Sequence, residues 1–250
     1  MPAFGLSLIV QIALIVHVLK TGRAYYWIFV IFLPGVGPLV YFIVELLPEL
    51  LESRRGRSAV RGIRKTLDPG ADLRQRQKEH KLSGSVDATR RLAGELLESG
   101  ETEKAIAHYE TALTGLYEHD PDLLLGLATA QFGNEQFDYA RQTLDRLIEH
   151  NPDYRSPDGH LLYARSVEAC GDGDKAREEY AALVEYYAGA EARVRYGAFL
   201  ESQGDNALAL NEYEEIMTAA DLAPRHYLIA QKHWINEAKA GIKRLNAGTQ

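Results

Sequence analysis

Four stretches of similar sequence decide the fold: ATRRLAGELLESGETEKAIAHYETAL (residues 88–113), DLLLGLATAQFGNEQFDYARQTLDRL (122–147), GHLLYARSVEACGDGDKAREEYAALV (159–184) and ARVRYGAFLESQGDNALALNEYEEIM (192–217). In each stretch a large apolar residue precedes a small one, and an alanine follows the small residue twelve positions later. The small residue recurs at positions 93, 128, 164 and 197. This nearly constant spacing predicts a tandem array of helical units.

The small residues have a physical role in such an array. Two antiparallel helices joined by a tight turn approach closely only where their side chains are small, and the large residues fill the space toward the next unit. One unit cannot bury its own apolar face, so several must stack. The small residues are Ala93, Ala128, Ala164 and Gly197, with Ala105, Ala140, Ala176 and Ala209 in the second halves.

The pattern resembles the tetratricopeptide repeat family over residues 86–221, although Gln131 stands where a bulky apolar residue is usual. The resemblance implies an all-α solenoid of four helix pairs, whose first helices line a concave face that binds a protein or peptide partner. The Lys/Asn clamp of the chaperone-tail receptors is not reproduced. On this alignment the predicted groove contains Arg90, Leu97, Thr129, Phe132, Arg165, Glu168, Val194 and Glu201.

Residues 222–250 follow the last unit, which would otherwise expose its apolar face. Pro224–Leu245 predicts a terminal helix with an apolar stripe at helical spacing, formed by Trp234, Ala238, Ile242 and Leu245. We expect this helix to cap the array; a partner-binding stripe is the alternative.

Residues 1–50 predict a membrane hairpin. Phe4–Leu19 and Ala24–Leu47 are mostly apolar, with Lys20 and Arg23 in the polar turn between them. A Pro-Gly-x-Gly-Pro break at 34–38 interrupts the second run, which predicts one kinked span in preference to a re-entrant loop. A cleaved signal peptide and a buried hairpin of a soluble protein are the alternatives.

The run RAYYWIFVIFLPGVGPLVYF (residues 23–42) resembles the N-terminal membrane hairpin of bacterial cardiolipin synthases. Those enzymes work through His-x-Lys motifs in a downstream domain, and this chain contains no His-x-Lys. The resemblance therefore implies a membrane anchor without lipid-synthase activity.

Charge is unevenly distributed along the chain. Residues 1–65 carry a net charge of +5, and residues 66–250, which we call the body, carry −12. The negative charge argues against nucleic-acid binding by the body. Residues 51–85 predict a juxtamembrane connector, and its basic residues outnumber those of the hairpin turn, so the body is predicted to be cytoplasmic at a bacterial inner membrane. The residues predicted to contact lipid headgroups are Arg54, Arg55, Arg57, Arg61, Arg64 and Lys65.

Catalytic motifs are missing from the sequence. The segment 171–175 (GDGDK) lacks the spacing of a phosphate-binding loop, and His226 and His233 have no supporting metal ligands nearby in sequence. Cys170 is interpreted as a small filler at the end of a helix. We predict no enzyme activity, no cofactor, no metal and no small-molecule substrate.

The hypothesis from sequence is a membrane-anchored scaffold that concentrates a protein or peptide partner beside the bilayer. A sensor of anionic lipid, using the hairpin and the basic connector, is the alternative. An enzyme with an unrecognised site is a third possibility.

Overall fold

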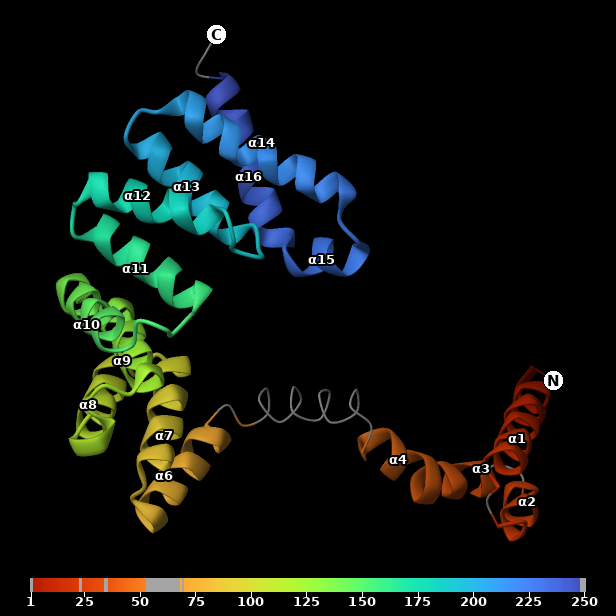
Figure 1. Ribbon diagram of the computed structural model, residues 1–250. Helices are drawn as coiled ribbons and strands as arrows, with labels where there is room; N and C mark the ends of the chain where they lie inside the picture. Colours follow the sequence, from red (N-terminus) through yellow and green to blue (C-terminus); the bar gives the residue numbers. More distant parts are fainter. Residues whose placement is uncertain (1, 23, 34–35, 53–67, 69, 248–250) are drawn as a thin grey trace. The chain divides into compact units, whose positions relative to one another are not determined.

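The computed structural model describes residues 2–22, 24–33, 36–52, 68 and 70–247, and every regular element among them is a helix. The chain divides into two compact units, residues 1–72 and 73–250 (Figure 1). We call them unit 1 and unit 2. The helical content agrees with the all-α prediction.

Unit 1 contains two helical segments that pack together. The first is one helix of 20 residues, and the second is a series of short pieces. Its small core consists of Val18, Trp27, Ile31 and Tyr41. The elements are α1 (Pro2–Thr21), α2 (Tyr26–Ile31), α3 (Val36–Tyr41), the π-helix η1 (Phe42–Leu46) and α4 (Leu47–Glu52).

The break between α2 and α3 allows a very close helix contact. A Cβ atom on Gly37 would lie 1.9 Å from the backbone oxygen of Val30, so only glycine fits there. Nearby, the Gln11 side chain of α1 donates a hydrogen bond of 3.2 Å to the carbonyl oxygen of Ile31. This side chain supplies a partner for a carbonyl at the end of α2, where the helix stops. Pro34 and Gly35, which belong to the predicted break, lie outside the described residues.

Among the described residues, none of the helices combines the length and the apolar content needed to cross a bilayer. The predicted transmembrane hairpin is therefore not supported. The basic residues 54, 55, 57, 61, 64 and 65, predicted to contact lipid headgroups, lie outside the described residues.

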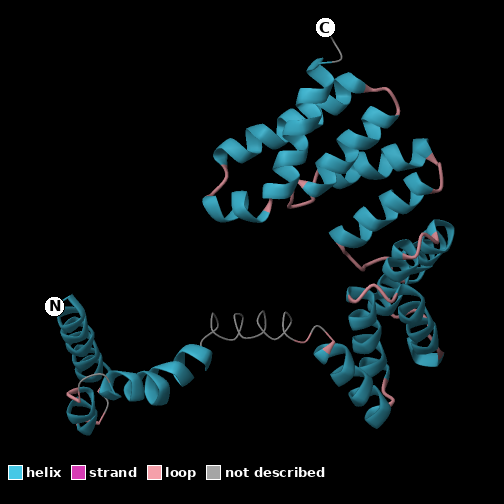
Figure 2. Ribbon diagram, turned by 180° about the vertical axis from the view of Figure 1, so that it is seen from behind, coloured by secondary structure: helices cyan, strands magenta, loops and turns pink. Residues whose placement is uncertain are grey.

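Unit 2 begins within a polar helix and continues with four helix pairs (Figures 1 and 2). The polar helix of the predicted connector is α6 (Ala71–Ser83). The pairs are α7 (Val86–Glu98) with α8 (Thr102–Ala112), α9 (Pro121–Gly133) with α10 (Phe137–His150), α11 (Pro157–Ala169) with α12 (Gly173–Val184), and α13 (Glu191–Ser202) with α14 (Asn206–Leu222); a 3-10 turn, η2 (Gly115–Tyr117), follows α8.

Local sequence sets the start of the first helix in three of the pairs. Ser85, Asp120 and Ser156 are N-caps whose side chains accept hydrogen bonds from backbone N–H groups three residues later. Proline occupies the first position of α9 and of α11, where its missing N–H costs nothing.

The turns within the pairs need a left-handed residue. Gly100, Gly171 and Gly204 have positive φ angles in the first, third and fourth pairs. In the second pair Glu135 takes this conformation with φ 60°, while the nearby Gly133 is the last residue of α9.

The predicted packing within the pairs is confirmed. All eight small residues are buried, and the large residue four positions after each alanine is also buried: Tyr109, Leu144, Tyr180 and Tyr213. The unusual Gln131 is explained by a polar contact, because the buried hydroxyl of Thr143 donates a hydrogen bond of 2.8 Å to its side-chain oxygen.

The C-terminal cap differs from its prediction in one respect. Two helices, α15 (Arg225–Ala230) and α16 (Lys232–Ala247), replace the single helix expected over 224–245. They separate at Gln231, whose side-chain oxygen accepts a hydrogen bond of 3.1 Å from the backbone N–H of Ala190. The stripe of α16 packs against the core of unit 2 as predicted, through Trp234, Ala238, Ile242 and Leu245.

Candidate partner-binding site

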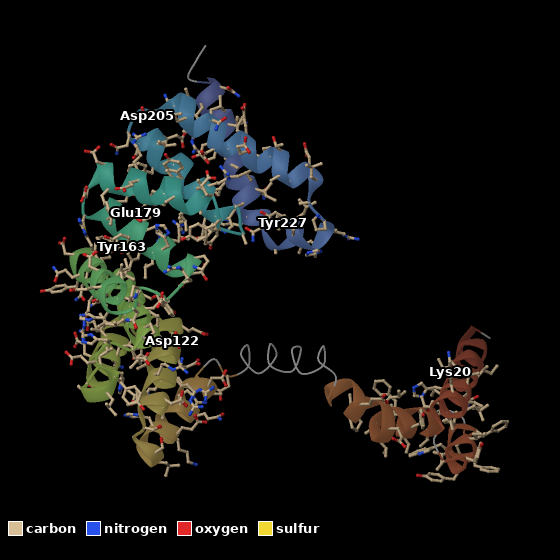
Figure 3. The ribbon with its side chains drawn as sticks, in the orientation of Figure 1. Lys20, Asp122, Tyr163, Glu179, Asp205 and Tyr227 are labelled. Atoms are coloured by element: carbon tan, nitrogen blue, oxygen red, sulfur yellow. The ribbon has the colours of Figure 1, made fainter. Side chains whose placement is uncertain are left out.

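The first helices of the four pairs, α7, α9, α11 and α13, form what we call the inner face of unit 2. Helix α9 packs on both α7 and α11. Figure 3 labels Asp122 on α9 and Tyr163 on α11. The predicted groove residues are distributed over these four helices: Arg90, Leu97, Thr129, Phe132, Arg165, Glu168, Val194 and Glu201.

Two predicted groove residues on the first two helices have their polar groups already engaged. Arg90 forms ion pairs with Asp87 at 3.2 Å and with Asp122 at 3.5 Å. The hydroxyl of Thr129 donates a hydrogen bond of 2.7 Å to the carbonyl oxygen of Leu125 in its own helix. Their bonding capacity for a partner is therefore reduced.

Leu97 and Phe132 form the apolar part of the predicted groove. Both side chains are partly buried and pack against the core clusters of unit 2. Phe132 also contacts Phe137 edge to face, with 5.1 Å between ring centroids. These contacts hold the Phe132 ring in one orientation.

Arg165 is the most distinctive charge on the inner face. Its guanidinium carbon lies 4.4 Å from the centroid of the Phe132 ring, a cation–π distance that links α11 to α9. The side chain is partly buried, and no ion pair or hydrogen bond joins it to any described residue. Burial lowers the pKa of Arg165, and the positive charge of Arg195 lowers it further. An arginine remains charged at neutral pH. The carboxylates of Glu191 and Glu168 act on this charge only from a distance, and neither forms an ion pair with it.

Two groove acids are committed to internal hydrogen bonds. The phenol of Tyr180 donates to Glu168 at 2.6 Å, and the phenol of Tyr213 donates to Glu201 at 2.9 Å, with the same sequence spacing in both pairs. Burial raises the pKa of both tyrosines, and the adjacent carboxylates raise it further, so both phenols stay protonated as donors. Arg244 of the cap also pairs with Glu201, at 2.7 Å.

Val194 does not lie on a surface. Its side chain is 7% exposed and belongs to the main hydrophobic core, so a partner cannot reach it in this arrangement. The aligned position predicted a groove residue, but this apolar side chain packs inward.

Sequence reasoning missed Arg195 and Trp234 as neighbours of the groove. The Arg195 guanidinium carbon lies 5.0 Å from the Trp234 ring centroid, and its Nε donates to Glu191 at 2.8 Å. The sequence pattern predicts that Trp234 belongs to a capping stripe, with partner binding by that stripe as the alternative. No sequence signal pairs these residues, because their contact depends on how α16 docks against α13.

In the part of the chain that the structure describes, no three His, Cys, Asp or Glu side chains gather as metal ligands.

Comparison with protein families gives one match. Residues 96–165 match the model of the tetratricopeptide repeat, which spans parts of the first three helix pairs. Residues 96–165 are thus similar to tetratricopeptide repeats, and the helix pairs of unit 2 form an all-α solenoid of this type. The comparisons do not support the resemblance of the N-terminal segment to cardiolipin synthases. No curated protein matches the chain.

Several solved structures share the fold at low sequence identity. A tetratricopeptide repeat protein from Parabacteroides merdae is 17% identical, with a TM-score of 0.53 over 81% of this chain and 84% of that one. TTC0263, a tetratricopeptide repeat protein from Thermus thermophilus, is 20% identical, with a TM-score of 0.51 over 66% and 88%. YrrB, described as having an unusual peptide-binding site, is 17% identical, with a TM-score of 0.50 over 68% and 90%.

Proposed function

We propose that this protein is a scaffold that binds a protein or peptide partner on the inner face of unit 2, with Arg165 and Phe132 as the anchor. The observation that carries the proposal is the partly buried guanidinium of Arg165, which rests on an aromatic ring and forms no ion pair with a described residue. YrrB, which shares the fold, is described as having a peptide-binding site.

The proposed ligand group is a carboxylate of the partner. A guanidinium taken partly out of water gains most from an anion that it can bind with two parallel hydrogen bonds. Arg90 is a weaker candidate on the same face, because it already has two carboxylate neighbours. A partner residue with an apolar surface would also pack against the Phe132 ring.

The test is quantitative co-purification of partners from detergent extracts of the cells that make the protein. Proteins captured by the full chain are compared with those captured by Arg165→Gln and Phe132→Ala variants, with Arg225→Gln on exposed α15 as the matched control. We expect at least a fivefold loss of the same proteins for both groove variants and no change for the control. Equal capture by all four chains would refute the groove assignment.

We further propose that unit 1 holds the scaffold at a lipid bilayer, with unit 2 on the cytoplasmic side. The support is the outward placement of large apolar side chains in the described part of unit 1, such as Phe29 (78% exposed) and Phe32 (73% exposed). Water disfavours a surface of this kind, and lipid chains would cover it. The cytoplasmic side is supported by the excess of basic residues after the second apolar run.

Extraction of washed membranes tests the lipid attachment. We expect the chain to remain in the membrane pellet in both concentrated salt and alkaline carbonate, conditions that remove proteins held by charge alone. Release by carbonate would contradict the attachment. A reporter fused after residue 250 tests the side, and a signal from the periplasm would reverse the assignment.

A further inference from the structure

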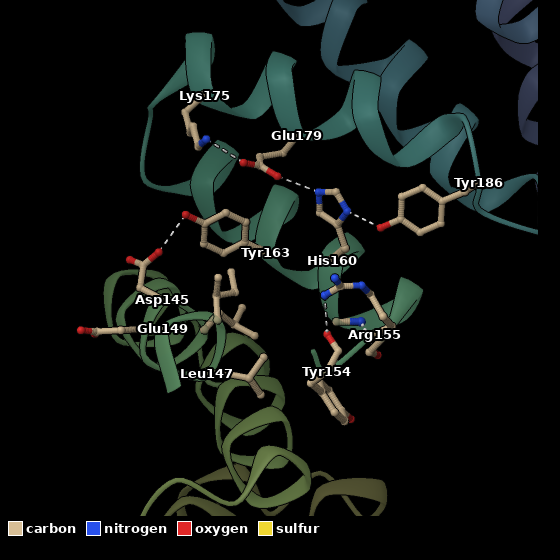
Figure 4. Close-up of a pocket in the computed structure, with 14 residues that line it drawn as sticks. Asp145, Leu147, Glu149, Tyr154, Arg155, His160, Tyr163, Lys175, Glu179 and Tyr186 are labelled. Carbon is tan, nitrogen blue, oxygen red and sulfur yellow. Dashed lines mark hydrogen bonds and ion pairs between the residues drawn. The ribbon is translucent and has the colours of Figure 1, made fainter. Parts of the chain in front are cut away.

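A pocket of about 770 Å³ lies in unit 2, apart from the predicted groove residues. It is bounded by α10, by the connection that follows it, and by α11 and α12 (Figure 4). None of the predicted groove residues lines it. Its volume falls in the range of about 300–1,000 Å³ that is typical of small-molecule sites.

One side of the pocket is apolar. Leu144, Leu147 and Tyr163 are buried and line the pocket from the core side. Ile148, one position further along α10, is 51% exposed although it is aliphatic. An apolar ligand would cover Ile148 and rest on the three buried side chains.

The polar wall of the pocket is internally satisfied. Glu179 accepts hydrogen bonds from Lys175 at 2.8 Å and from Nε2 of His160 at 2.7 Å. Because a carboxylate only accepts, Nε2 donates to Glu179, and the other ring nitrogen is hydrogen-bonded to the hydroxyl of Tyr186. Figure 4 shows His160 between Glu179 and Tyr186. Because these groups already bond to one another, they have little remaining capacity to bind a charged group of a ligand.

A contact equivalent to the one between His160 and Glu179 occurs in the next helix pair. Arg193 and Glu212 pair at 2.7 Å, and their separation in sequence equals that of His160 and Glu179. This equivalence indicates that the contact between His160 and Glu179 has a structural role within the helix pair. The acid Asp145 is likewise engaged, because it accepts a hydrogen bond of 2.8 Å from Tyr163.

Arg155 is the remaining cation of the pocket lining. Its Nη1 donates to the carbonyl oxygen of Pro152 at 2.6 Å, and no carboxylate pairs with it among the described residues. Its exposed side chain lines the pocket, so Nε and Nη2 remain available to an anion. Glu149 also lines the pocket and disfavours a second negative charge on the ligand.

We propose that this pocket binds a small organic acid, whose apolar body covers Leu147, Ile148 and Tyr163 and whose single carboxylate pairs with Arg155. The size of the pocket, its apolar side and its one unmatched cation among the described residues each favour this chemistry. The site is separate from Arg165 and adds a ligand to the proposed scaffold function.

The experiment titrates the full chain, in nonionic detergent, with 4-phenylbutyrate. Methyl NMR of isoleucine-labelled protein follows Ile148 at the pocket and Ile235, buried in the cap, as the internal reference. We expect saturable shifts for Ile148 and none for Ile235. The neutral amide of the same compound is expected to bind at least fivefold more weakly, because it lacks the charge.

Two pairs of variants locate the site. Arg155→Gln is expected to weaken binding at least fivefold, whereas Arg165→Gln should leave it unchanged. Ile148→Glu should reduce binding at least tenfold, while Leu208→Glu, at a similarly exposed leucine of α14, should have no effect. These four are followed by calorimetric titration, since one replaces the NMR reporter.

Three outcomes would overturn the proposal. Equal affinity for the acid and its amide would show that the carboxylate does not contribute to binding. Unchanged binding by the Ile148→Glu variant would show that the acid does not bind in this pocket. Loss of binding in the Arg165→Gln variant, with binding retained in the Arg155→Gln variant, would place the binding site for the acid at Arg165 instead.

Discussion

Unit 1 and unit 2 distribute their side chains in opposite ways. Unit 2 buries many of its large apolar side chains in a continuous core, with the fully buried Tyr180 and Leu183 as examples. In the described part of unit 1, aromatic side chains such as Phe29 and Phe32 point outward, while polar contacts join the two helical segments. The Gln11 amide meets the Ile31 carbonyl oxygen there, and the His17 ring meets the Tyr41 hydroxyl at 3.0 Å.

The two units nevertheless share one packing device, a glycine where helices cross. Gly37 admits the backbone at Val30 in unit 1. In unit 2 the ring of Tyr213 lies between Gly197 and Gly241, where an added Cβ would come within 2.6 Å and 2.4 Å of it. Both units thus use glycine at close contacts between helices. They differ in the side chains that they place on their surfaces. The following changes test this comparison.

Replacing Tyr213 by alanine is expected to have the largest effect. The side chain is 1% exposed and fills the space between α13 and α16, so its loss leaves a cavity between the two glycines. We expect the free energy of unfolding of unit 2 to fall by about 3–5 kcal/mol. Urea unfolding followed by the fluorescence of Trp234, in a Trp27→Phe background, measures it.

The control for this change is Tyr213→Phe. It keeps the ring and removes only the hydrogen bond to Glu201, which retains its ion pair with Arg244. A loss of about 1 kcal/mol is expected. If the alanine and phenylalanine variants unfold at the same urea concentration, the ring is not what joins α16 to the array.

Replacing Gly37 by alanine tests the same device in unit 1. The new Cβ would meet backbone atoms, which cannot rotate away as a side chain can. We expect a loss of about 1–3 kcal/mol in the stability of unit 1, the usual cost of overpacking. Denaturant titration of Trp27 fluorescence in a Trp234→Phe background reports it, because Trp27 is only 6% exposed and contacts Tyr41 edge to face.

Val36→Ala, on the same helix at a position 59% exposed, is the matched control for Gly37. It should leave the Trp27 transition unchanged. An equal response to both substitutions would show that the contact at Val30 does not limit the packing of unit 1.

Much of unit 2 follows from its sequence because the determinants are local and repeated. The small residues, the capped helix starts and the stripe of α16 all mark contacts that depend on neighbouring sequence or recur from unit to unit. Gln131 is anomalous in the repeat pattern, and its explanation, the hydroxyl of Thr143, requires the position of the neighbouring helix.

Other features depend on individual contacts that no repeat predicts. Glu135 adopts the left-handed conformation without the glycine that signals it elsewhere. The separation of α15 from α16 coincides with the hydrogen bond between Gln231 and Ala190. At the candidate site, alignment placed Arg165 and Phe132 on one face. Only the three-dimensional arrangement reveals that they touch and that Val194, another groove position, is buried.

The smallest predicted effect concerns pH and the first helix pair of unit 2. Burial lowers the pKa of His108, and the neighbouring His80 ring, with 5.3 Å between centroids, lowers it further. The folded chain therefore binds this proton more weakly than the unfolded chain, whose histidines titrate near pH 6.5. The contribution of His108 to the free energy of unfolding is therefore fully present above pH 6.5. It is lost as the pH falls through 6.5 toward the lower pKa of the folded state.

His108→Gln should remove this contribution and leave the pH dependence of the remaining groups. Urea midpoints at pH 7.5 and pH 5.5 measure the difference, which is expected to be smaller in the variant than in the natural chain. The effect is small because His108 is partly exposed to water. If the variant loses as much stability on acidification as the natural chain, protonation of His108 plays no part, and the contact of α6 with the array would then be insensitive to this titration.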